Sequence, residues 1–298
     1  MHGFVQKVRR QLRRHRLVEP GARVLAAVSG GPDSVALARS LAALAVPFEI
    51  AYVDHRTRPE TADEARFVAA LAAELGRPFH ALTCDPGRAS EAELREGRYA
   101  ALRGVGLELI ATGHTASDQA ETVLLRLVRG TGTSGLSGMA PRRGDLVRPL
   151  LGVTRDDVMA YLGDLGQPYC TDPTNEHLDP LRNRVRWRLL PLLRDELQPR
   201  IDALLCRLAD AARADREALE ALASAHLARH GLALGPLCAL HPGLRVHVLR
   251  EACPVALTEE RLAALQDLVA SGRGQVQIEG RVTAEVPSGG RQLVFRAT

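Results

Sequence analysis

The chain has 298 residues, of which 46% are hydrophobic and 25% are charged, which is ordinary for a soluble protein with one large and one small domain. No apolar run approaches the ~20 residues that span a bilayer. The basic N-terminal stretch also lacks the apolar core of a signal peptide, so we expect a cytoplasmic protein without a membrane partner. The five cysteines include no Cys-x-x-Cys pair, which argues against a disulfide framework, a zinc site or an iron–sulfur cluster.

Short apolar segments alternate with helical segments along the first two-thirds of the chain. After a basic amphipathic helix, apolar strands are predicted at residues 24–28, 48–53, 79–83 and 107–112. Helices are predicted at residues 34–44, 60–75, 91–102 and 116–128. This alternation is typical of βαβ units and predicts an α/β fold built on a doubly wound parallel sheet. The Gly/Ser/Thr-rich residues 130–138 interrupt the pattern and are expected to form a mobile loop beside a site.

The composition changes near residue 200. A helix at residues 154–165 and a basic helical segment at 183–193 precede this point. Beyond it, helices are predicted at residues 201–228, 243–251 and 258–269, and short strands at 275–278, 281–286 and 292–295. We therefore predict a catalytic domain over residues 1–199 and a smaller C-terminal α+β domain over residues 200–298.

A polar, glycine-rich stretch, Ser29-Gly30-Gly31-Pro32-Asp33-Ser34, lies between the first predicted strand and the following helix. Open α/β sheets bind ligands at this place, where backbone N–H groups and a helix N-terminus can receive phosphate. Lys7 is the only lysine, which excludes a Walker-type loop ending in Gly-Lys-Ser/Thr. Asp33 would repel polyphosphate unless a cation bridged the two, so the stretch predicts a metal–nucleotide site. The alternative is a plain Gly-Gly turn capped by serine.

Acidic residues begin the helix that follows the fourth predicted strand. Asp118 and Glu121 are three residues apart and therefore share a helix face. That face begins at the same sheet edge as the glycine-rich stretch, and His114 and Gln119 crowd the same turn. A solvated acidic helix start, favoured by the helix dipole, is the alternative.

These stretches carry a resemblance to known families. Ser29 to Ser34 resembles the Ser-Gly-Gly-x-Asp-Ser signature of the PP-loop, or N-type ATP pyrophosphatase, family. The segments Gly113–Thr122, Arg95 to Tyr99 and Arg182 to Arg186 are similar to those of the tRNA(Ile)-lysidine synthetase family. Ser117 stands where that family usually has aspartate, so metal binding is assigned to Asp118 instead.

The resemblance implies ATP and Mg²⁺ as cofactors, and free L-lysine and the CAU-anticodon isoleucine tRNA as substrates. The wobble cytidine would be adenylated, and lysine would then replace AMP at carbon 2. The implied catalytic residues are Asp33, Arg95 and Glu121. The implied ATP-binding residues are Ser29, Gly30, Gly31, Pro32, Asp33, Ser34, Val53, His55 and His114. The implied metal ligands are Asp33, Asp118 and Glu121, and the implied RNA or nucleotide contacts are Arg98, Arg182, Arg184 and Arg186.

Other readings remain open on the sequence alone. Arg95 and Arg98 would by themselves be surface residues, and alternating arginines at residues 182–188 could simply cover a core with their stems. A PP-loop tRNA thiolase is disfavoured because the cysteine pairs typical of sulfur transfer are missing. A small-molecule ligase and a non-catalytic nucleotide-binding regulator are the further alternatives. The oligomeric state is also open, a homodimer included.

Overall fold

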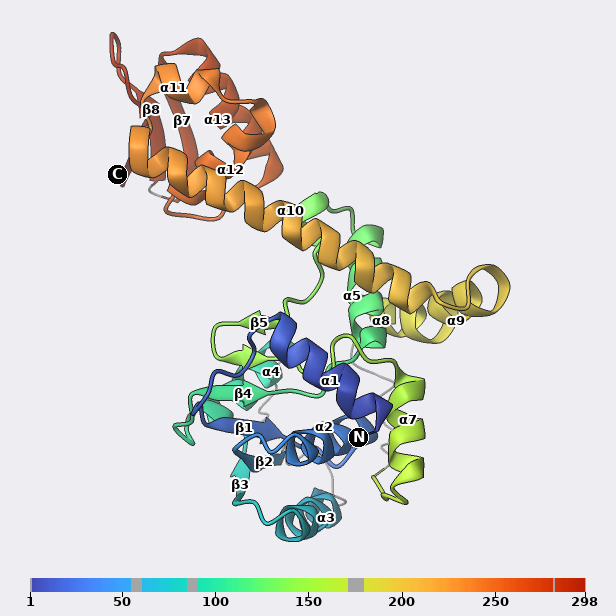
Figure 1. Ribbon diagram of the computed structural model, residues 1–298. Coiled ribbons are helices and arrows are strands. Elements are labelled where there is room, and N and C mark those ends of the chain that lie inside the picture. Colours follow the sequence, from blue (N-terminus) through green and yellow to red (C-terminus); the bar gives the residue numbers. More distant parts are fainter. Residues whose placement is uncertain (1, 55–60, 85–90, 171–179, 281, 298) are drawn as a thin grey trace. The chain divides into compact units, whose positions relative to one another are not determined.

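The computed structural model describes residues 2–54, 61–84, 91–170, 180–280 and 282–297 (Figure 1). The chain forms two compact units, Met1–Ala211 and Ala212–Thr298. The division falls inside the long helix α10 (Ile201–His230), C-terminal to the predicted change at residue 200. None of the helices in the described residues is long and apolar enough to cross a membrane.

The first unit is built on a six-stranded sheet with the strand order β3-β2-β1-β4-β6-β5. The strands are β1 (Val24–Ala27), β2 (Phe48–Asp54), β3 (Phe79–Thr83), β4 (Leu109–Ala111), β5 (Arg142–Arg143) and β6 (Leu146–Val147). All neighbours are parallel except β5, which pairs antiparallel with β6. The strand order reverses between β1 and β4, so the carboxyl ends of these two strands form a switch point, where α/β sheets bind ligands.

Helices cover both faces of this sheet (Figure 1). The helices of the first unit that precede α10 are α1 (Gly3–Arg14), α2 (Pro32–Ala43), α3 (Thr61–Glu74), α4 (Glu91–Arg103), α5 (Ala116–Val128), α6 (Thr133–Leu136), α7 (Arg155–Asp164), α8 (Pro180–Arg184) and α9 (Leu190–Leu192), with π-helical turns η1 (Val185–Leu189) and η2 (Leu193–Leu197). On one face, Val24, Ala26 and Ile50 pack with α1, α2, α3 and α7. On the other face, Leu25 and Ala51 pack with α4. Successive residues of each strand thus point to opposite faces of the sheet, and each face is covered by helices. This arrangement confirms the α/β prediction.

Three local features differ from the prediction. The antiparallel pair β5 and β6 is too short to produce a period-two pattern and was not expected. The polar residues 130–138 contain helix α6 and are tied to α5, because Arg126 Nη1 donates to Gly135 O at 2.8 Å and to Gly138 O at 3.0 Å. The basic segment is interrupted by the π-helical turns η1 and η2, a distortion that often occurs at functional sites.

The second unit has its own core. Its helices after α10 are α11 (Leu234–Ala239), α12 (Pro242–Ala252) and α13 (Glu259–Ser271), and its strands are β7 (Gly274–Glu279), β8 (Val282–Val286) and β9 (Val294–Ala297). The strands form an antiparallel sheet in the order β7-β8-β9. Leu249, Leu265 and Ile278 are buried together in this core. The expected helical region ending in short strands is confirmed, with α11 added.

Candidate active site

The glycine-rich stretch forms a turn between β1 and α2. Gly31 is the N-cap of α2 and Pro32 occupies its first turn, where proline's missing N–H costs nothing. The Ser34 hydroxyl donates to Gly31 O at 2.8 Å and accepts from Ser29 N at 3.2 Å. The turn is therefore held by its own side chains, with the positive end of the α2 dipole directed at its opening.

Two glycines allow this turn its shape. Gly30 has φ +90°, a conformation that residues with a side chain rarely adopt. Gly113, at the end of β4, lies against the backbone of the turn: a Cβ built on it would be 3.1 Å from Asp33 C, Asp33 O and Ser34 N. The segment that follows β4 therefore lies directly against the first turn of α2 at the switch point.

Asp33 projects from the first turn of α2 into a partly buried position. Its Oδ2 forms an ion pair with Arg155 at the start of α7. Its Oδ1 is buried and has no hydrogen-bond partner among the described residues. Burial raises the pKa of Asp33 to about 6, and Asp118 adds to this effect while Arg155 opposes it. A buried carboxylate oxygen with no partner, next to a second carboxylate, is suited to a cation.

A carboxylate–arginine cluster lies on the inner face of α5. Glu121 is almost fully buried, with 2% of its side chain exposed, and accepts from Arg182 and, at 2.8 Å, from Arg186 Nε. Arg186 Nη2 also lies 3.2 Å from Asp118 Oδ1. Asp118 Oδ2 accepts from the backbone N–H of Thr115 at 2.8 Å, which fixes the start of α5. The guanidinium of Arg186 thus bridges the two carboxylates.

His114 lies in a positively charged surrounding. Its Nδ1 is 2.8 Å from the Thr112 hydroxyl. Burial lowers the pKa of His114 to about 4; Asp118 opposes this effect, whereas Arg148, Arg95 and Arg98 add to it. The imidazole is therefore neutral at pH 7, and the three arginines that act on it come from α4 and from the residue after β6.

Arg95 and Arg98 of α4 also lie near an aromatic ring. Their Cζ atoms are 5.6 Å and 5.4 Å from the ring centroid of the buried Tyr99. Arg148 is 4% exposed and donates from Nη1 to Ala140 O at 2.7 Å, while its buried Nε has no partner among the described residues.

The structure brings most of the predicted site residues to one sheet edge. Ser29, Gly30, Gly31, Pro32, Asp33 and Ser34 form the turn, and Asp118, Glu121, Arg182 and Arg186 form the cluster on α5. Val53 is half-buried near the end of β2. Arg184 is exposed and takes no part in the cluster. His55 lies outside the described residues.

Sequence reasoning missed two arginines. Arg155 stands in an ordinary helix start and is separated from Asp33 by more than half of the predicted catalytic domain, so no local pattern links the two. Arg148 follows a strand of only two residues, which leaves no recognisable signal. Both contacts arise from the pairing of β6 with β4 and from the packing of α7.

The close approach of Gly113 to the turn gives a first prediction. Gly113→Ala is expected to lower kcat/KM for ATP ~10-fold, because the turn must shift by a few tenths of an ångström. Steady-state kinetics with varied ATP check this. The matched control is Gly163→Ala in α7, where a Cβ meets nothing within 4 Å; kinetics unchanged in both variants would contradict the tight contact.

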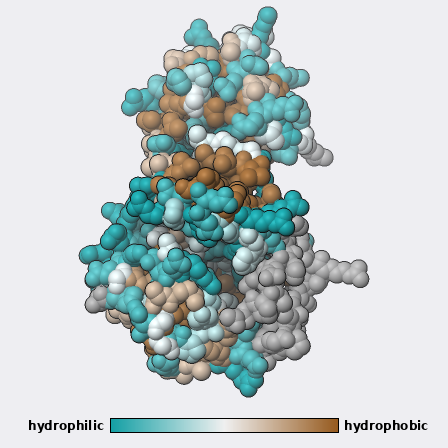
Figure 2. Space-filling view, turned by 90° about the vertical axis from the view of Figure 1, so that its right-hand side faces the viewer, coloured by the Kyte–Doolittle hydropathy of each residue, from teal (hydrophilic) through white to brown (hydrophobic). Residues whose placement is uncertain are grey.

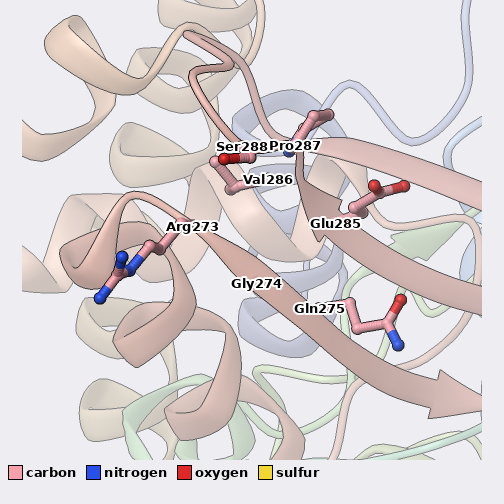
Figure 3. Close-up of a pocket in the computed structure, with 7 residues that line it drawn as sticks. All are labelled: Arg273, Gly274, Gln275, Glu285, Val286, Pro287 and Ser288. Atoms are coloured by element: carbon pink, nitrogen blue, oxygen red, sulfur yellow. The ribbon is translucent and has the colours of Figure 1, made fainter.

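A pocket in the second unit is the alternative location for a site. It has a volume of about 470 Å³ and is lined by Arg273, Gly274, Gln275, Glu285, Val286, Pro287 and Ser288. Figure 3 shows that the side chain of Arg273 points away from Gln275 and Glu285. Glu285 is instead paired with Arg296 at 3.1 Å. These polar groups do not converge, so the switch point of the first unit is the better candidate site.

Comparisons with known proteins concern the family of the chain. Residues 4–193 match the model of the PP-loop domain family. A tRNA(Ile)-lysidine synthase from Gloeobacter violaceus is 42% identical over 223 residues, covering 70% of this chain and 69% of that protein. One from Salinispora tropica is 40% identical over 302 residues, covering 91% of this chain and 90% of that protein.

A solved structure shows the same fold. The U34-tRNA thiolase NcsA from Methanococcus maripaludis, with its [4Fe-4S] cluster, superposes with a TM-score of 0.58 at 17% identity. The match covers 70% of this chain and 79% of that one, and at this identity it concerns the fold alone. The family model and these relatives show that the chain belongs to the tRNA(Ile)-lysidine synthase family of PP-loop proteins.

Proposed function

We propose that this chain is an ATP-dependent carbon–nitrogen ligase that joins free L-lysine to carbon 2 of the wobble cytidine in the CAU-anticodon isoleucine tRNA. The observation that carries the proposal is the meeting of the Ser29–Ser34 turn with the carboxylates of α5 at one switch point, in a chain of this family. Such a site can hold a nucleotide triphosphate and a cationic substrate side by side.

The chemistry proceeds in two displacements. Oxygen 2 of the cytosine attacks the α-phosphate of ATP, and pyrophosphate leaves. The ε-amino group of lysine then attacks carbon 2 and loses a proton, and AMP leaves with the former oxygen 2. Adenylation is needed because the oxygen of a cytosine carbonyl is otherwise a very poor leaving group, so the protein acts mainly by positioning and by neutralising charge.

The residues at the turn fit a Mg²⁺–ATP complex. Mg²⁺ in such sites usually takes one or two carboxylates and completes its shell with phosphate oxygens and water. Asp33 offers a buried oxygen without a partner among the described residues, and Asp118 is close enough to raise the pKa of Asp33. In the described part of the chain, no group of three or more acidic, histidine or cysteine residues is arranged to hold a metal ion. When bound, Mg²⁺ would neutralise phosphate charge beside Asp33 and Asp118.

Glu121 is the residue we assign to lysine or, with Asp118, to the metal. Both of its oxygens accept from arginines in the free protein. Each oxygen keeps a second lone pair, but the side chain is only 2% exposed, so we infer that Arg182 or Arg186 shifts when the carboxylate receives an ammonium group or a cation. Arginines released in this way would lie beside the phosphates of ATP or of the tRNA, where bidentate contacts are favoured.

We assign the remaining charges to the substrates. Arg95, Arg98 and Arg148 surround the neutral His114 and would meet the phosphates or the adenylate, with the buried Nε of Arg148 as a donor that no described residue uses. Val53, with His55, is assigned to the adenine side. We assign the basic helix α1 and the second unit to tRNA contact. We place the protein in the cytoplasm, and we propose a homodimer as its oligomeric state.

The proposal is tested by incubating the protein with ATP, Mg²⁺, labelled lysine and isoleucine tRNA of CAU anticodon. Label should enter this tRNA with equal release of AMP and pyrophosphate. A matched tRNA whose wobble cytidine is replaced by uridine should take up none. Pyrophosphate release with no label transfer to RNA would favour a small-molecule ligase instead.

A further inference from the structure

Trp187 is an exposed aromatic residue that the proposed chemistry does not use. It is the only tryptophan of the chain, and 59% of it is exposed. It lies on η1, directly after Arg186, which reaches inward to Asp118 and Glu121. A large aromatic surface left in water beside a reaction site is more typical of a binding surface than of a core.

The neighbouring residues divide between two sides of this helical segment. Val185 and Arg186 face the interior, where Val185 is 2% exposed. Arg184 and Arg188 are exposed with Trp187, and their spacing of four residues places both on the outward side. Neither guanidinium forms an ion pair or hydrogen bond with another described residue. The outward side therefore presents one indole and two exposed guanidinium groups, which we call the Trp187 platform.

The charge of this platform favours RNA over a second copy of the chain. An exposed aromatic face beside arginines is the usual means of holding an unpaired base and its flanking phosphates. A twofold contact through the platform would instead bring Arg184 and Arg188 against the same arginines of the other copy. Figure 2 shows that apolar and hydrophilic surfaces lie side by side on one face of the molecule.

We propose that Trp187 stacks on an unpaired tRNA base adjoining the reacting cytidine, with Arg184 and Arg188 on the neighbouring phosphates. This inference rests on the proposed function, because it takes the RNA substrate from it. The proposal explains why one short helical segment carries both an inward arginine and an exposed tryptophan. Arg186 holds the carboxylates of the site, and the next residue along the chain would hold the strand that delivers the base.

The single tryptophan makes the test direct. Titration with the anticodon stem-loop of the isoleucine tRNA should quench the intrinsic fluorescence of Trp187, with the same Kd as anisotropy of the labelled RNA. Trp187→Ala should weaken RNA binding by about 5- to 100-fold and raise KM for RNA, with kcat retained at saturating RNA. Trp187→Phe should restore affinity to within ~3-fold.

The control is Leu197→Ala on η2, which removes an apolar side chain of a residue 71% exposed and should leave RNA affinity unchanged. Equal effects of Trp187→Ala and Leu197→Ala, or no quenching by RNA that is converted to product, would overturn the stacking role alone. A protein that transfers no lysine at all would overturn the proposed function instead. Dimerisation that Trp187→Ala abolishes, with RNA affinity intact, would assign the platform to a second copy.

Discussion

Replacing Asp33 with asparagine is expected to abolish lysine transfer and, at pH 8, to raise the melting temperature of the protein measured without nucleotide and metal. Burial raises the folded-state pKa of this carboxyl to about 6 from 3.8, so folding favours its protonated form. The cost of ionisation is fully present above pH 6 and disappears as the pH falls to about 4. A difference of about 2 pKa units corresponds to ~2–3 kcal/mol, which the neutral amide of the Asp33→Asn variant would recover.

Calorimetry at pH 8, 6 and 4.5 checks the sign. The gain of Asp33→Asn over the unaltered protein should shrink as the pH falls, and Mg²⁺–ATP should stabilise the variant less than the unaltered protein. Asp157→Asn is the matched control of opposite sign. Burial opposes ionisation of Asp157, but its contacts with Lys7, at 2.8 Å, and Thr154 outweigh this and hold its pKa below the usual value. Its replacement should lower stability at pH 8 and leave turnover intact. A pH-independent change for Asp33→Asn would contradict the electrostatic account.

Replacing Glu121 with alanine is expected to reduce both stability and activity. The substitution leaves Arg182 and Arg186 facing a buried space without an anion, because Glu121 is 2% exposed. Removing one partner of a buried pair costs about 3–5 kcal/mol when both charges are buried, but these guanidiniums are about one-third exposed. We therefore expect about 2–3 kcal/mol, a melting temperature lower by ~5–10 °C, and turnover lower by at least ~10²-fold.

Thermal denaturation and the lysine-transfer assay measure these effects. Glu121→Gln preserves the side-chain volume and one acceptor, so it should recover part of the stability but little of the activity. The matched control is Asp145→Ala, which breaks the exposed pair with Arg103, Oδ2 to Nε 2.6 Å, and should cost less than ~1 kcal/mol. A Glu121→Ala protein with unchanged melting and full turnover would remove the residue from both roles.

The sequence by itself determined the α/β class and located the glycine-rich turn between β1 and α2. The alternation of short β-type segments with helical segments located β1, β2 and β3, and β1 is the continuous apolar run expected of a buried parallel strand. The turn from Ser29 to Ser34 was recognisable because its chemistry is local: glycines, serines and an aspartate act within six residues. The shared face of Asp118 and Glu121 followed in the same way from helix geometry.

Only the tertiary structure decided which charges meet across the fold. Arg155 is paired with Asp33 because β6 lies next to β4 and carries the chain back to the start of α2. Arg182 and Arg186 reach Glu121, whereas Arg184 and Arg188 face outward with Trp187. These arrangements depend on contacts between residues far apart in the chain and on a π-helical turn, and neither leaves a periodic signal in the sequence. The residue types of the candidate site are thus recognisable from local sequence, whereas the ion pairs around them arise from packing.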